Sequence, residues 1–139
     1  MTSIRTLFGT ALLASCVAST AAAFASDYSV SFALDVDHVS DWGRVACEYA
    51  TPCKIVSRRT KLSVSLAFQE PNHRNVFIRA TRAEDGVDCC YFSAGADEIA
   101  RDVEVSPVRV HVYAKRGATR DFFLNQPFGV LYFQFLDMR

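Results

Sequence analysis

The sequence has no surplus of charge and no concentrated basic segment. Its 139 residues include 15 Lys and Arg against 15 Asp and Glu, so the net charge at neutral pH is zero. A protein that binds nucleic acid usually gathers positive charge along a stripe or a tail. The basic residues of this chain are scattered instead, which argues against a nucleic-acid partner.

The motifs of most enzyme classes are missing as well. The chain has only three histidines and contains no G-x-S-x-G sequence, the turn that carries the nucleophilic serine of many hydrolases. It also lacks a glycine-rich phosphate loop and a dinucleotide-binding fingerprint. We therefore expect a protein that is not an enzyme and that holds no cofactor.

Helical patterns are scarce. Only the segment from Ala94 to Val103 could hold two turns, and Pro107 follows soon after it. Its acidic residues Asp97 and Glu98 suit the first turn of a helix. We expect at most one short helix, near residues 95–103.

Alternation of apolar and polar residues with a period of two dominates the rest of the chain. It is clearest in Tyr28 to Val36, in Leu62 to Phe68 and in Val108 to Ala114, where every second residue is apolar. This pattern is typical of strands with one buried and one wet face. The sequence predicts an all-β fold, an antiparallel β-sandwich of the immunoglobulin-like or jelly-roll-like kind.

Two further segments bear on the arrangement of the strands. Val76 to Thr81 and Val87 to Ser93 flank Asp85-Gly86, a dipeptide that favours a tight hairpin turn. The run from Phe128 to Leu136 is almost continuously apolar. We expect a hairpin from the first pair and a central, buried strand from the last run.

The N-terminal segment has the features of an export signal. Arg5 is its only charged residue, an apolar run follows, and Ala23-Phe24-Ala25 fits a cleavage site. We expect a signal peptide over 1–25 and a single secreted or periplasmic domain over 26–139, with one more acidic than basic residue. Alternatively, Leu13-Ala14-Ser15-Cys16 fits a lipobox, in which case lipid on Cys16 would anchor the chain to a membrane.

Four cysteines, Cys47, Cys53, Cys89 and Cys90, lie beyond this signal. In an exported chain such a set most often forms disulfides. Because adjacent strand residues point to opposite faces, we expect Cys89 and Cys90 to bond separately to Cys47 and Cys53. The alternative is a Cys47–Cys53 bridge, with the adjacent pair as thiols or as a redox-active bridge. The spacing does not fit the paired C-x2-C motifs of zinc sites.

One polar cluster and one loop region remain as candidate sites. The cluster of Asp35, Asp37, His38 and Asp41 lacks the glycine and the closing glutamate of a calcium-binding loop, so we expect no metal there. A lone tryptophan in a small β domain is most often a core residue, but beside arginines it is also a natural binding anchor. The candidate binding surface comprises Trp42, Arg44, Tyr49, Arg58, Arg59, His73 and Arg74.

These observations predict an exported, disulfide-stabilised binding module. Its partner would be a protein, a glycan or a component of the cell envelope, engaged through loops. The alternative is a small redox-active or metal-handling protein that uses Cys89 and Cys90.

Overall fold

The computed structural model describes residues 26–82, 87–116 and 127–139. Strands make up most of this part of the chain, together with one short 3-10 turn, η1, at Ser93–Gly95. The strands are β1 (Tyr28–Val36), β2 (Val39–Cys47), β3 (Cys53–Val56), β4 (Leu62–Phe68), β5 (Asn75–Arg82), β6 (Val87–Tyr91), β7 (Ile99–Asp102), β8 (Val108–Arg116) and β9 (Gly129–Leu136).

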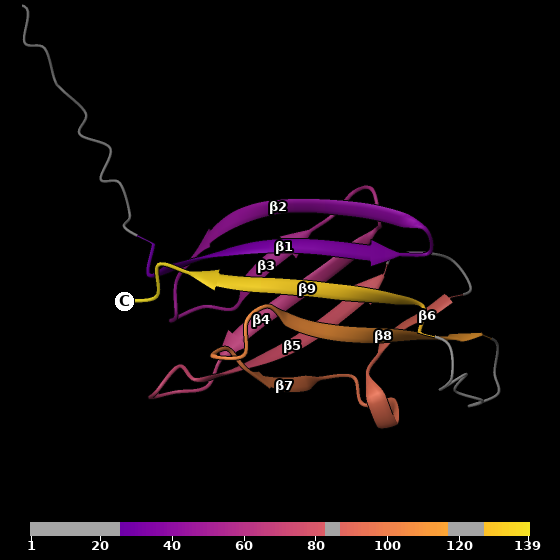
Figure 1. The fold of residues 1–139 in the computed structure, drawn as a ribbon. Coiled ribbons are helices and arrows are strands. Elements are labelled where there is room, and N and C mark those ends of the chain that lie inside the picture. The colour runs from indigo at the N-terminus through magenta and orange to yellow at the C-terminus, as the bar shows by residue number, and fades with distance from the viewer. Residues whose placement is uncertain (1–25, 83–86, 117–126) are drawn as a thin grey trace, which may run out of the picture.

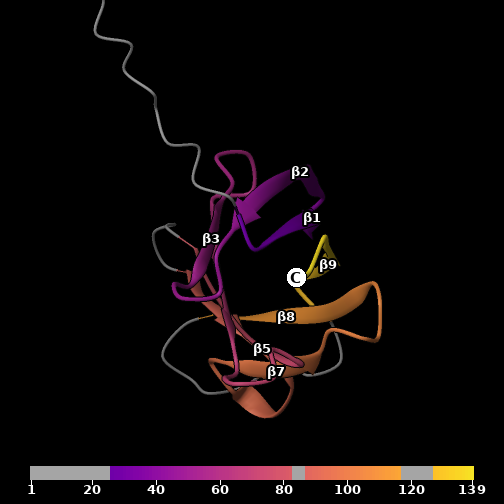
Figure 2. The ribbon, with the colours of Figure 1, turned by 90° about the vertical axis from the view of Figure 1, so that its left-hand side faces the viewer.

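The strands form two antiparallel sheets packed face to face (Figure 1). One sheet has five strands in the order β2-β1-β9-β8-β6, and the other has four in the order β3-β4-β5-β7. Figure 2 shows how the five-stranded sheet curves from β2 through β9 to β8 around one side of the molecule. The predicted all-β sandwich is therefore confirmed.

The core lies between the two sheets and follows the alternation of the sequence. In β1 the side chains of Tyr28, Val30, Leu34 and Val36 are almost completely buried, whereas Asp35 between the last two is exposed. Burying these apolar side chains supplies most of the free energy that holds the sheets together. Their counterparts in the other strands are Ile55, Leu62, Val64, Leu66, Val76, Ile78, Val108, Val110, Val112, Leu131 and Phe133.

Strands β1 and β2 form a hairpin whose turn consists of two residues. Asp37 and His38 both have positive φ, 53° and 63°, and Val36 pairs with Val39 across them. Positive φ at both central residues is the mark of a type I′ turn, which suits the twist of a hairpin. This part of the acidic cluster therefore serves as a turn.

The strands with strict alternation form where the sequence predicts them. β1, β4 and β8 cover the three alternating segments, and β5 and β6 cover most of the two segments around Asp85-Gly86. β9 lies between β1 and β8, so the apolar C-terminal run is the middle strand of its sheet. Its predicted central place is confirmed.

No α-helix forms near 95–103, which agrees with the expected limit of at most one short helix. This segment contains the η1 turn and strand β7, which pairs with β5 through Phe77 and Ala100 and through Ile78 and Ile99. Two isolated helical turns are marginal in water, and pairing with β5 satisfies the same backbone groups while Ile99 packs against the core. No helix among the described residues is long and apolar enough to span a membrane.

The predicted hairpin between β5 and β6 is also wrong. β6 pairs with β8 in the five-stranded sheet, whereas β5 belongs to the four-stranded sheet. The chain thus crosses between the sheets here, and the Asp85-Gly86 turn itself lies outside the described residues. Strands β2, β3 and β7 were not predicted at all.

Two glycines allow close approaches that a side chain would prevent. A Cβ at Gly129 would meet the backbone oxygen of Asp35 and would lie 2.9 Å from the Val36 Cα. A Cβ at Gly43 would lie 2.9 Å from Cζ of the Phe32 ring. Backbone atoms within a sheet have little room to move, whereas the far end of a ring has more.

We therefore predict that Gly129→Ala destabilises the protein more than Gly43→Ala does. Overpacking of this kind typically costs about 2 to 3 kcal/mol against backbone, and about 1 kcal/mol where a side chain can yield. Chemical denaturation of both variants measures the difference in the free energy of unfolding. Equal stability of Gly129→Ala and the unchanged protein would contradict the β1–β9 packing.

Candidate functional site

The seven residues of the predicted binding surface do not form one continuous site. Trp42, Arg58 and Arg59 lie around the place where β2, the edge of one sheet, meets the loop after β3, the edge of the other. Tyr49 and His73 stack together elsewhere, and Arg44 and Arg74 are held in ion pairs. The first group is the strongest candidate for a binding site.

Two links fasten β2 to β3 and the loop that follows it. At one end, Cys47 and Cys53 form a disulfide. Further along, the buried hydroxyl of Ser57 donates a 2.6 Å hydrogen bond to Oδ2 of Asp41. We call the region around the second link, formed by Asp41, Trp42, Lys54 and residues 56–59, the seam.

The loop side of the seam is fixed by its own hydrogen bonds. Ser57 Oγ accepts from the backbone N–H of Thr60 at 3.1 Å, and the Ser57 N–H donates to the carbonyl of Leu62 at 2.9 Å. The side chain of Thr60 is buried, with only 1% exposed. Residues 58 and 59 therefore project into solvent from a rigid base.

Trp42 lies on the outside of the molecule. Its side chain is 70% exposed, and the guanidinium of Arg59 lies 5.9 Å from the centre of its ring system. The interpretation of Trp42 as a core residue is therefore wrong. It faces outward because β2 is a strand whose alternate residues Asp41, Gly43 and Val45 take the less exposed face.

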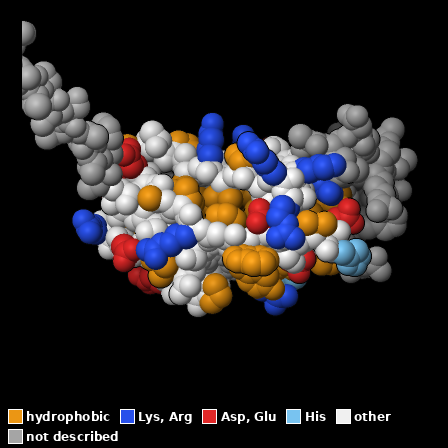
Figure 3. Space-filling view, turned by 90° about the horizontal axis from the view of Figure 1, so that it is seen from above, with side chains coloured by type: hydrophobic (Ala, Val, Ile, Leu, Met, Phe, Trp, Pro, Cys, Tyr) orange, Lys and Arg blue, Asp and Glu red, His pale blue; other side chains and the backbone are white. Residues whose placement is uncertain are grey.

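The seam also has exposed residues that the sequence did not single out. Val56, next to Ser57, is 71% exposed, and Lys54 projects from the same side of β3. Figure 3, which views the molecule from above β2, shows Lys and Arg side chains among hydrophobic ones on this face, with some Asp and Glu side chains between them. Within the described residues no carboxylate forms an ion pair with Lys54, Arg58 or Arg59. The seam thus combines exposed apolar surface with positive charge.

The other two arginines of the predicted surface have partners. Arg44 contacts Asp137 at 2.6 Å and Ser29 Oγ at 3.0 Å, which links β2 to the residue after β9. Arg74 donates to Asp102 at 3.0 Å and lies 3.4 Å from Glu104.

The ion pair with Arg74 also affects the pKa of Asp102. The pKa of Asp102 is lowered, first by the hydrogen bond that it accepts from the Glu104 N–H and then by its bond from Arg74. Both arginines therefore join parts of the chain, and neither is a free cation.

Tyr49 and His73 belong to an aromatic cluster at one end of the sandwich. Their rings stack with centroids 3.8 Å apart and planes inclined by 4°. Tyr49 also stacks on Tyr28 at 5.0 Å, and Phe68 meets both tyrosines edge to face. Such contacts stabilise a structure beyond simple burial, so this pair contributes to the packing of that end.

Burial in this cluster changes the titration of its tyrosines. Loss of water around Tyr28 raises its pKa to about 12, and the charges of Tyr49 and Asp27 act in the same direction. The Tyr28 hydroxyl has no hydrogen-bond partner among the described residues. The same causes, desolvation first and Asp27 second, raise the pKa of Tyr49.

The cysteine pairing differs from the predicted one. Cys47 bonds to Cys53, and Cys89 bonds to its neighbour Cys90. Cys47 pairs with Tyr28 at the start of β1, whereas β6 joins β8 beyond the end where Val36 pairs with Gly129. The two pairs of cysteines thus lie at opposite ends of the sandwich and cannot bond to each other.

The predicted alternation of faces is also interrupted at Cys90. The register of β6 against β8 shifts between Cys89 and Tyr91. Regular alternation of side chains is interrupted at such an irregularity. The outcome is the alternative pairing that the sequence left open.

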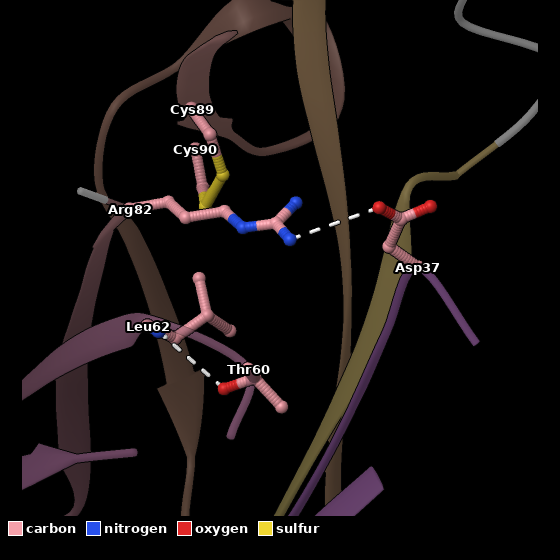
Figure 4. Close-up of a disulfide and its surroundings, with 6 residues drawn as sticks. All are labelled: Asp37, Thr60, Leu62, Arg82, Cys89 and Cys90. Atoms are coloured by element: carbon pink, nitrogen blue, oxygen red, sulfur yellow. Dashed lines mark hydrogen bonds and ion pairs between the residues drawn. A yellow bond between two sulfur atoms is a disulfide. The ribbon is translucent and has the colours of Figure 1, made fainter. Parts of the chain in front are cut away.

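A buried arginine lies beside the Cys89–Cys90 disulfide (Figure 4). The side chain of Arg82 is only 7% exposed, and its Nη2 lies 3.7 Å from Oδ2 of Asp37. Its guanidinium also lies 4.8 Å from the centre of the Phe128 ring. Arg82 itself was not among the candidate site residues, because nothing in the sequence shows that an arginine at the end of β5 points inward.

The described residues contain no group of three or more histidine, cysteine or acidic side chains that could hold a metal ion. The three histidines lie on separate elements. His38 is in the β1–β2 turn, His73 is in the loop before β5, and His111 is in β8.

We predict that replacing Cys47 and Cys53 together by alanine lowers the free energy of unfolding by about 2 kcal/mol. A bridge over this short loop restricts the unfolded chain, and its loss frees the link between the two sheet edges. Denaturant titration of the double variant measures the effect. An unchanged midpoint would show that the bridge contributes nothing.

We predict that stability falls as the pH rises above about 10 because of Tyr28. The unfolded chain releases the phenol proton near the ordinary value of 10.0, whereas the folded protein retains it to about 12. The contribution of Tyr28 to stability is therefore fully present below pH 10. Above that pH the free energy of unfolding declines by at most about 1.4 kcal/mol per pH unit.

The Tyr28→Phe variant should not show this decrease in the free energy of unfolding above pH 10. At pH 7 it should be as stable as the unchanged protein. Unfolding free energies between pH 8 and 11 test this, with Tyr132→Phe, a partly exposed ring on β9, as the control. If Tyr28→Phe and Tyr132→Phe lose stability in parallel, the burial of the Tyr28 hydroxyl does not matter.

No protein-family model matches this chain, and neither the curated protein sequences nor the solved structures include a match.

Proposed function

We propose that this protein is an exported, non-enzymatic binding module that engages a macromolecular partner through the seam. The observation that carries the proposal is the position of Trp42, whose ring is 70% exposed on a strand that two links hold in place. Trp42 and Val56 together offer exposed apolar surface whose removal from water by a partner would contribute favourably to binding. Tryptophan and arginine together are typical of the residues that dominate binding energies.

Rigidity supports the same proposal. Binding costs less free energy when the side chains and loops at the interface are ordered beforehand. The Asp41–Ser57 hydrogen bond and the buried Thr60 fix the base on which Trp42, Arg58 and Arg59 stand. The disulfides fit a protein that works outside the cytoplasm.

The positive charge of the seam favours an acidic partner. Lys54, Arg58 and Arg59 are exposed, and the seam's carboxylate, Asp41, is engaged by Ser57 and by the Trp42 N–H. An acidic surface of an extracellular protein or envelope glycan complements this arrangement. Complementary charges raise the rate of association and decrease in effect as salt is added.

The test is a pull-down from periplasmic extract or culture medium, followed by affinity measurement on the recovered partner. Trp42→Ala should weaken binding about 30-fold or more, as expected for removal of a dominant interface residue. Val105→Ala is the matched control, because Val105 is 69% exposed but follows β7.

Two results would overturn the proposal. One is the absence of any partner in every extract, and the other is equal loss of affinity in Trp42→Ala and Val105→Ala. Reversal of charge in Arg58→Glu together with Arg59→Glu should weaken binding most at low salt.

A further inference from the structure

The Cys89–Cys90 disulfide does not hold the fold together in the way that Cys47–Cys53 does. A cross-link stabilises a protein by restricting parts of the unfolded chain that would otherwise move apart. Cys47–Cys53 joins edge strands of two different sheets. Cys89–Cys90 joins adjacent residues of one strand, so it restricts almost nothing. Its place in the molecule calls for another explanation.

The two sulfur atoms differ in their access to solvent. Cys90 is 5% exposed and belongs to the core, whereas Cys89 is partly exposed. β6 is an edge strand of its sheet, so a reagent can approach it from the side. A thiol from outside would therefore reach Cys89 in preference to Cys90.

The charge next to the disulfide favours the reduced form of a cysteine. Arg82 lies beside the pair and points its guanidinium across the end of the sandwich toward Asp37 (Figure 4). An arginine remains charged under all ordinary conditions. A nearby cation stabilises a thiolate relative to the thiol, and burial strengthens this effect because little water screens it.

We propose that Cys89 and Cys90 form a reversible dithiol–disulfide couple that exchanges with external thiols, with Arg82 as the positioning residue for the thiolate of Cys90. The partner is a small thiol or the dithiol of a second protein. The proposal is independent of binding at the seam, which lies on other strands.

The exchange proceeds in two steps. A thiolate of the reductant attacks Sγ of Cys89, a sulfur–sulfur bond forms between them, and the Cys89–Cys90 bond breaks with its electron pair on Sγ of Cys90. A second thiolate then attacks the reductant's sulfur and releases Cys89 as a thiolate. Two electrons have reduced the protein, two reductant thiols have become one disulfide, and protons are taken from solvent according to each thiol's pKa.

The first test uses the folded protein in buffers of reduced and oxidised dithiothreitol or glutathione. Free thiols are trapped by alkylation and located by mass spectrometry, while circular dichroism monitors the fold. Cys47–Cys53 serves as the internal control. We expect Cys89–Cys90 to open at a reductant ratio at least tenfold lower, with the fold intact. Simultaneous opening of both disulfides, or opening of Cys89–Cys90 only in denaturant, would overturn the proposal.

The second test addresses Arg82 through the pH dependence of alkylation of the reduced pair. Arg82→Gln should shift the profile to higher pH and slow alkylation severalfold at pH 7, and Arg82→Lys should restore much of the rate. Arg79→Gln is the control, since Arg79 lies on the same strand but is exposed and paired with Glu98. An identical profile in Arg82→Gln would exclude the role of Arg82.

If Arg82→Gln does not fold, the pH profile of alkylation of the unchanged, reduced protein still tests the proposal. At least one of the two thiols should ionise below the ordinary cysteine value of about 8.5. Ionisation of both thiols at or above that value would contradict a thiolate stabilised by Arg82.

Discussion

The geometry of the seam depends on the fastening of two sheet edges that have no hydrogen-bonded ladder between them. β2 and β3 belong to different sheets, and the chain passes from one to the other in only a few residues. The Cys47–Cys53 bridge fixes the start of this crossing, and the Asp41–Ser57 hydrogen bond fixes the strands further along. Pairing with β1 fixes the strand that carries Trp42, and the two links hold the loop with Arg58 and Arg59 beside it.

Different kinds of side chain occupy the two ends of the sandwich, apolar rings at one end and a charged group at the other. At one end, aromatic rings from Tyr28, Tyr49 and Phe68 fill the space between the sheets. At the other end, the buried guanidinium of Arg82 lies near both Asp37 and the Phe128 ring. The first end is inert packing. The second retains a charge in a poorly hydrated place, where its cost is offset by the ion pair with Asp37.

The sequence predicts the fold class and the regular strands because each of β1, β4 and β8 places an apolar side chain inward at every second position. It does not reveal β2, since two of that strand's inward positions hold Asp41 and Gly43. Those residues depend on distant partners, Ser57 and the ring of Phe32. The cysteine pairing and the place of Arg82 likewise depend on β6 leaving β5 for β8, which no local pattern encodes.

The carboxylate of Asp41 has one more consequence. It accepts a 3.0 Å hydrogen bond from the backbone N–H of Trp42, a group on an edge strand that another chain's strand would need in order to add to the sheet. A charged side chain in the middle of an edge strand is a common protection against such pairing. The protein can therefore display a large aromatic ring on an open sheet edge while its backbone resists self-assembly into extended β-structure, and the proposed recognition at this edge would rest on side chains.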